Sequence, residues 1–228
     1  MIYNKYAMPV DPRTLEKDFK SSPGTMKSIK DLLTLLTNVS SAESLTTDEL
    51  GFIAKTVKKL WYEINLKKGI NLTDREKLFP VFKEMNRVFK GKKTISAAYR
   101  GVRMPQYAKN GISKSEPGFE KILEGLAYGL RSWTELDYIA LDWATGKIDD
   151  STDKAKGRDK VVFEINNPRV VLDCNAVLNF YMDNYYIRGM KRSDFFLDTG
   201  EYILFLEDPV VAGIEQMSDE MYLVKVID

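Results

Sequence analysis

The chain has 228 residues, which suits one domain of ordinary size with a smaller addition. Its 34 basic and 33 acidic residues nearly cancel, which argues against a nucleic-acid coat protein and a polybasic membrane-binding protein. The only cysteine, Cys174, excludes an intramolecular disulfide, and the absence of histidine excludes an imidazole base and any histidine-containing metal site. Any catalysis here would therefore use carboxylates, hydroxyls, arginine, lysine or the backbone.

The first 25 residues contain three prolines and predict an irregular arm. Residues 1–8 lack the apolar centre of a secretory signal, and no apolar run approaches the ~20 residues needed to cross a bilayer. We therefore expect a protein that is not secreted through a signal peptide.

Three amphipathic helices are predicted in the basic first part of the chain. The first covers about residues 26–39, and each of the next two opens with a capping box, Thr46 with Glu49 and Thr73 with Glu76. Pro80 would kink the third helix. Residues 1–92 hold 17 basic and 11 acidic residues, whereas the remainder holds 17 and 22. The net charge thus changes from positive to negative along the chain. Together with the predicted helices, this change indicates a helical segment over residues 1–93 and a second part over 94–228.

The second part predicts short strands with few helices. A helix is expected at residues 137–144, ending before Gly146, and residues 118–130 fit either a helix or a loop. The polar run 147–160 predicts a surface loop. The expected strands cover residues 94–99, 161–165, 169–172, 202–206 and 221–227, with a weaker one at 210–214. Helices followed by many strands predict an α+β fold.

Three motifs in this second part carry groups that could perform chemistry. Arg100 is followed by Gly101, and an arginine fork suits phosphate oxygens while glycine permits close approach of a ligand. Ser132 and Thr134 alternate on a strand that leads into a helix, and Glu201 opens an apolar strand. Taken singly, each motif also fits a bland explanation: a turn, a helix cap or a solvated strand end.

Taken together, the order Arg, Ser-x-Thr, Glu resembles the Arg-Ser-Glu class of mono-ADP-ribosyltransferases. Tyr99-Arg100-Gly101 matches the family's aromatic-Arg-Gly strand, Ser132-Trp133-Thr134 its Ser-Thr-Ser strand, and Glu201 the glutamate that begins an apolar strand. The resemblance covers about residues 94–228. It implies a core of two packed, mainly antiparallel sheets, preceded by a variable helical extension.

The resemblance also implies NAD as co-substrate, no metal, and roles for four residues. Arg100 would bind the phosphates, and the backbone of Gly101 would hold the nicotinamide amide. Ser132 would hydrogen-bond Glu201, which would accept from the ribose 2′-hydroxyl and stabilise positive charge that develops on the ribose.

Further site residues follow from the same resemblance. Thr134 would support the strand, whereas Trp133 or Tyr138 would either stack on the nicotinamide ring or pack in the protein. The turn that contains Phe195, Phe196 and Thr199 would face the acceptor. Thr199 stands where arginine-modifying members of the family have Glu or Gln, so the acceptor could be another group or water.

Three functions remain open at this point. The first is transfer of ADP-ribose from NAD to a host macromolecule, a protein or alternatively a nucleic acid, by a bacteriophage-type enzyme acting in the host bacterial cytoplasm and not at a membrane. The second is an NAD glycohydrolase on the same fold. The third is a non-enzymatic interaction protein with a degenerate NAD pocket, which the altered Ser-Thr-Ser motif and Thr199 favour.

Overall fold

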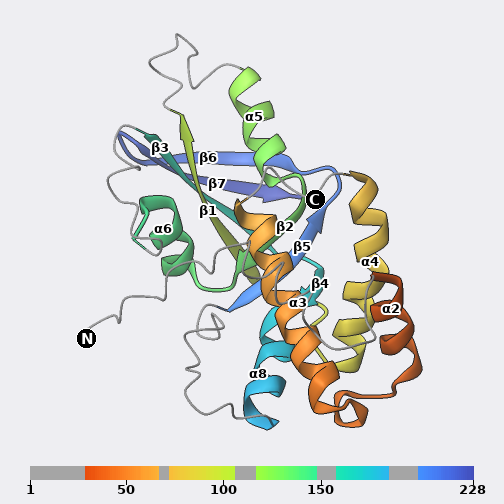
Figure 1. Ribbon diagram of the computed structural model, residues 1–228. Helices are drawn as coiled ribbons and strands as arrows, with labels where there is room; N and C mark the ends of the chain where they lie inside the picture. Colours follow the sequence, from red (N-terminus) through yellow and green to blue (C-terminus); the bar gives the residue numbers. More distant parts are fainter. Residues whose placement is uncertain (1–28, 67–71, 106–116, 148–157, 185–199) are drawn as a thin grey trace. The chain divides into compact units, whose positions relative to one another are not determined.

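The computed structural model describes residues 29–66, 72–105, 117–147, 158–184 and 200–228, labelled by element in Figure 1. They fall into two compact units. One comprises the chain up to Lys92 together with Val171–Asp198, and the other comprises Lys93–Val170 and Thr199–Asp228. Phe195, Phe196, Thr199 and most of the expected loop 147–160 lie outside the described residues.

The first unit is helical. Its elements are α2 (Ile29–Asn38), the short 3₁₀ helix η1 (Ala42–Ser44), α3 (Thr47–Leu66), α4 (Leu72–Val88) and α8 (Cys174–Asn184). The first predicted capping box is confirmed at α3. The Glu49 N–H donates to the Thr46 hydroxyl at 3.3 Å, and the Thr46 N–H donates to the Glu49 carboxylate at 2.8 Å. Pro80 lies inside α4.

Helix α8 was not predicted from the sequence, although its pattern is regular. It buries five residues at helical spacing: Cys174, Val177, Leu178, Tyr181 and Met182. Asp173 caps its start, because one carboxylate oxygen accepts the Ala176 N–H at 3.0 Å while the other accepts the Lys92 N–H at 3.0 Å. Residues 171–184 therefore pack with the N-terminal helices, whereas the sequence-based division places them in the second part.

The strands form one sheet in the order β4-β5-β2-β1-β3-β7-β6. β3 and β7 are parallel, and the pairs β1–β2, β1–β3, β2–β5 and β6–β7 are antiparallel. The strands are β1 (Ala97–Pro105), β2 (Gly129–Thr134), β3 (Arg158–Asn166), β4 (Val170–Asp173), β5 (Glu201–Leu206), β6 (Val210–Ser218) and β7 (Met221–Ile227). The architecture is α+β and mainly antiparallel, as predicted.

The two packed sheets that the resemblance implied are not found within the described residues. β1 pairs with β3 along its whole length, and β2 pairs likewise with β5. β1 and β2, by contrast, are paired at one position, Tyr99 with Thr134. That single pairing joins two parts of the sheet into one.

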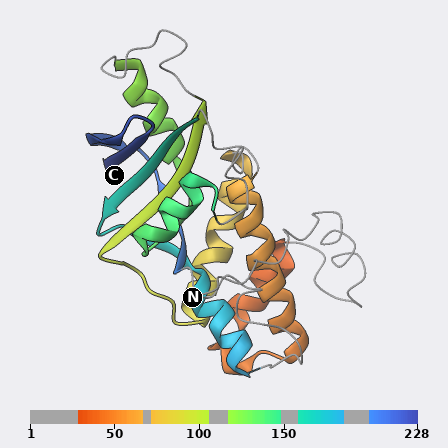
Figure 2. The ribbon, with the colours of Figure 1, turned by 90° about the vertical axis from the view of Figure 1, so that its left-hand side faces the viewer.

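Helices cover both faces of this sheet (Figure 2). On one face, α5 (Pro117–Ala127) contributes Phe119 and Leu123 to the main apolar cluster. On the other face, α6 (Asp137–Thr145) packs Ala140 and Ala144 against Val162 and ends before Gly146, as predicted. The segment 118–130, which fitted a helix or a loop, is thus mostly helical. Over the part of the chain described here, none of the helices combines the length and apolar character needed to span a membrane.

Candidate active site

The pairing of β2 with β5 gathers polar side chains on one face of two neighbouring strands. Thr134 lies opposite Glu201, and Ser132 lies two residues away along β2. Since side chains alternate along a strand, all three share one face. They are nearly excluded from solvent, with exposed fractions of 5% for Ser132, 2% for Thr134 and 4% for Glu201.

A hydrogen bond joins the predicted serine and glutamate. The Ser132 hydroxyl donates to the Glu201 carboxylate, and the two residues are 69 positions apart in the sequence. A buried carboxylate costs free energy unless hydrogen bonds satisfy it, and a bond to a charged group is stronger than a neutral one. The bond therefore both stabilises the buried carboxylate and fixes its direction.

Arg100 extends this chain of contacts from β1. Its Nη1 donates to the main-chain oxygen of Ser132 at 2.8 Å. Burial lowers the pKa of Arg100 to about 9; the positive charge of Arg131 lowers it further, while the Glu201 carboxylate acts in the opposite direction. The guanidinium is still protonated at neutral pH. The structure thus brings Arg100, Ser132 and Glu201 together, with a half-buried guanidinium near a buried carboxylate.

Gly101 has a structural role that the sequence did not reveal. A Cβ at this position would overlap the main-chain oxygen of Ala140 and lie 2.7 Å from the main-chain nitrogen of Ala144. Helix α6 therefore occupies the space that the missing side chain leaves on this face of β1. The sequence-based explanation was approach by a ligand; the close approach that the structure shows is that of a helix.

The two aromatic candidates for nicotinamide stacking lie in different surroundings. Trp133 lies on the opposite face of β2 from Ser132, inside the main core, where its ring meets Phe163 edge-on at 6.5 Å between centroids. We therefore assign Trp133 to packing. Tyr138, in the first turn of α6, is 48% exposed, and of the two it alone has a ring accessible to a ligand. Thr134 accepts the Leu136 N–H at 3.1 Å and so shapes the chain after β2.

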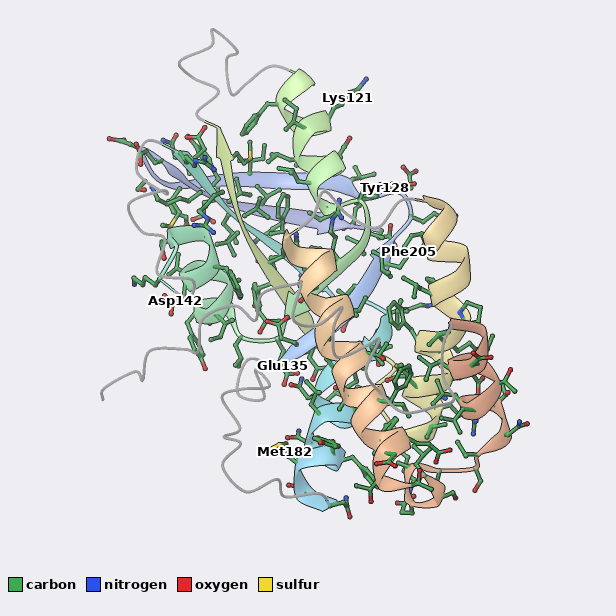
Figure 3. The ribbon with its side chains drawn as sticks, viewed as in Figure 1. Lys121, Tyr128, Glu135, Asp142, Met182 and Phe205 are labelled. Carbon is green, nitrogen blue, oxygen red and sulfur yellow. The ribbon has the colours of Figure 1, made fainter. Side chains whose placement is uncertain are left out.

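Glu135 also belongs to this site and was not singled out in the sequence. Its N–H donates to the main-chain oxygen of Gly200 at 3.1 Å, and its carboxylate accepts the Tyr202 hydroxyl at 3.0 Å. Figure 3 labels its position between β2 and α6. Because these partners lie 65 and 67 residues further along the chain, no local pattern could have pointed to them.

The chain matches no protein-family model and no curated protein sequence. Among solved structures it is similar to HopU1 of Pseudomonas syringae pv. Tomato DC3000, an ADP-ribosyltransferase, with 13% identity, a TM-score of 0.40 and coverage of 98% of this chain and 99% of that one. It is also similar to the Vis toxin of Vibrio splendidus, an ADP-ribosyltransferase, with 12% identity, a TM-score of 0.34 and coverage of 91% of this chain and 89% of that one. A third similar structure is an ADP-ribosyltransferase of Clostridium botulinum, with 11% identity, a TM-score of 0.33 and coverage of 90% of this chain and 96% of that one.

Proposed function

We propose that the protein is a mono-ADP-ribosyltransferase that moves ADP-ribose from NAD to an acceptor macromolecule and releases nicotinamide. One observation carries the proposal: Arg100 donates to the main chain of Ser132, whose hydroxyl donates to Glu201. These residues come from three strands and lie far apart in sequence. They are also the three residues that resemble the Arg-Ser-Glu motif.

The reaction suits a site without histidine. Breaking the bond between nicotinamide and ribose creates an oxocarbenium-like centre, which a nearby carboxylate stabilises as in glycoside hydrolysis. Nicotinamide leaves as a neutral molecule and needs no proton from a general acid. Glu201 supplies the negative charge and accepts the ribose 2′-hydroxyl, while Ser132 holds the carboxylate in position.

Binding of NAD uses the neighbouring strand. A guanidinium has five N–H donors in a planar fork, so the bond from Arg100 to Ser132 is compatible with binding of diphosphate oxygens. In the described part of the chain, β1 and β2 are paired at Tyr99 and Thr134 alone. On the side of β1 that faces β2, the backbone of Gly101 is therefore not part of the β1–β2 pairing. This position suits main-chain hydrogen bonds from Gly101 to the nicotinamide amide.

The acceptor is a host protein, with nucleic acid as the alternative, in the cytoplasm of a bacterium infected by a phage that encodes the enzyme. Thr199 favours a second candidate function, hydrolysis of NAD, because arginine-modifying enzymes of the resembled class have Glu or Gln at that position. In that case water takes the place of the acceptor.

The test is incubation of labelled NAD with the protein and a bacterial lysate, comparing the wild type with Glu201→Gln. Transfer predicts label on a macromolecule in proportion to nicotinamide release, whereas hydrolysis predicts nicotinamide without labelled acceptor. Mass spectrometry of the labelled material would identify the target. A wild type that releases no nicotinamide, and whose thermal unfolding temperature does not rise with NAD, would favour the non-enzymatic interaction protein.

A further inference from the structure

The residues on either side of Glu201 are both bonded to one residue of the connection between β2 and α6. We propose that Glu135 is a positioning residue that holds the Glu201 carboxylate in its reactive direction. The inference rests on the proposed function for the role of Glu201, but the contacts that carry it do not.

The first contact precedes Glu201. The main-chain oxygen of Gly200 accepts the Glu135 N–H at 3.1 Å. Gly200 has a φ of +59°, a backbone conformation that residues other than glycine rarely adopt. A Cβ on Gly200 would also lie 3.0 Å from Cγ of Glu135 and 3.5 Å from Cγ of Leu136. The backbone that leads into β5 is therefore fitted closely against residues 135 and 136.

The second contact follows Glu201. The hydroxyl of Tyr202 donates to the Glu135 carboxylate at 3.0 Å, and a hydrogen bond of this kind gains strength from the charge. The Tyr202 side chain belongs to the main core and is 2% exposed, so its ring is fixed by packing. Through its backbone and its side chain, Glu135 thus connects the residue before Glu201 to the residue after it.

The neighbours of the exposed Glu135 are restrained by hydrogen bonds. The Thr134 hydroxyl accepts the Leu136 N–H at 3.1 Å, and the Leu136 oxygen accepts the Ile139 N–H at 3.1 Å where α6 begins. Glu201 is the first residue of β5, so strand pairing restrains the backbone on its C-terminal side only. Glu135 supplies the restraint at this strand end. Displacements of about 1 Å in a catalytic group can cost on the order of 10²-fold in rate, so such a restraint has a kinetic effect.

The experiment measures nicotinamide release from NAD by purified full-length variants. Glu135→Ala and Tyr202→Phe should each lower kcat about tenfold, the usual scale for a hydrogen bond to a charged group, with KM for NAD unchanged. The double variant should be no slower than either single variant, because both remove the same bond. Glu135→Gln should keep most of the activity, since the amide oxygen still accepts from Tyr202.

Tyr222→Phe is the matched control. Tyr222 lies on β7, a strand without a proposed site residue, and is also 2% exposed. Its hydroxyl donates to the main-chain oxygen of Asp219, in the turn that precedes β7. It should leave kcat unchanged. The inference is overturned if Glu135→Ala keeps the wild-type kcat, if Glu135→Gln is as slow as Glu135→Ala, or if Tyr222→Phe is as slow as Tyr202→Phe.

Amide hydrogen exchange separates failure of this inference from failure of the proposed function. The amides of residues 135 and 201 should exchange faster in Glu135→Ala and Tyr202→Phe, and at the wild-type rate in Tyr222→Phe. This holds even if the wild type releases no nicotinamide, an outcome that rejects the proposed function alone. Unchanged exchange in Glu135→Ala would reject the positioning role whatever the activity.

Discussion

Two strand pairs of the same sheet differ in what they bury. The β2–β5 pair holds three polar side chains, Ser132, Thr134 and Glu201, on one nearly solvent-free face. The middle of the β3–β7 pair is apolar on both faces, with Val162 opposite Leu223 and Phe163 opposite Val224. Polar groups lower stability when buried, unless each is bonded. In β2–β5 the buried polar groups share one face and are bonded to one another, and this is the pair that carries the proposed site.

The sharpest test of this contrast exchanges one carboxylate in each pair. Glu201→Gln should lower the rate of nicotinamide release by about 10²–10³-fold, the scale of a lost electrostatic group in a transition state, and leave NAD binding largely intact. Glu164→Gln changes a half-buried carboxylate on β3, which lies opposite Lys225 of β7, and should keep the wild-type rate. Steady-state kinetics and an NAD titration measure both. Equal rates for the two variants would remove the functional difference between the strand pairs.

The next test concerns stability at the contact between β1 and α6. Gly101→Ala should lower the free energy of unfolding by about 3 kcal/mol, because the methyl group overlaps main-chain atoms that cannot rotate away. Urea denaturation measures the change. Gly213→Ala in β6 is the control, since the new methyl group would meet no described atom within 4 Å. A Gly101→Ala protein as stable as the control would contradict the position of α6.

Removal of the serine hydroxyl should have a smaller effect that falls mainly on activity. Ser132→Ala deletes the bond to Glu201 and should lower kcat about tenfold, with a loss of about 1–2 kcal/mol in stability. The same kinetic and urea measurements apply. Ser218→Ala, on exposed β6, should change neither quantity. If kcat is unaffected by Ser132→Ala, the hydroxyl does not orient the carboxylate.

The smallest expected effect lies in the helical unit and separates stability from activity. Thr46→Ala removes the cap of α3 and should cost about 1 kcal/mol of stability, with nicotinamide release per folded molecule unchanged. Thr37→Ala, which removes an exposed hydroxyl bonded within α2, should be nearly neutral. A fall in kcat for Thr46→Ala would mean that loss of stability alone lowers activity, and would weaken the kinetic interpretation of the other variants.

Local sequence patterns predicted much of the fold. The bounds of β7 and the end of α6 before Gly146 follow from alternation and a helix stop. α8 was missed although its apolar residues recur at helical spacing behind an acidic cap.

The site was predictable only in part. The meeting of Arg100, Ser132 and Glu201 could be anticipated from a resemblance, and the position of Trp133 follows from alternation along β2. The need for glycine at position 101 and the contacts of Glu135 depend on elements that meet only in the folded chain. No spacing rule connects residues 135 and 202.

The alternation of side chains along β2 and β5 makes the relative alignment of these two strands critical. Trp133 and Tyr202 fill the core on one face, while Ser132 and Glu201 form the site on the other. A shift of β2 past β5 by a single residue would turn Trp133 toward the proposed NAD site and Ser132 into the apolar core. The packing of these two bulky rings thus fixes the register of β2 against β5. Substitutions that weaken this packing should lower the catalytic rate before they unfold the protein.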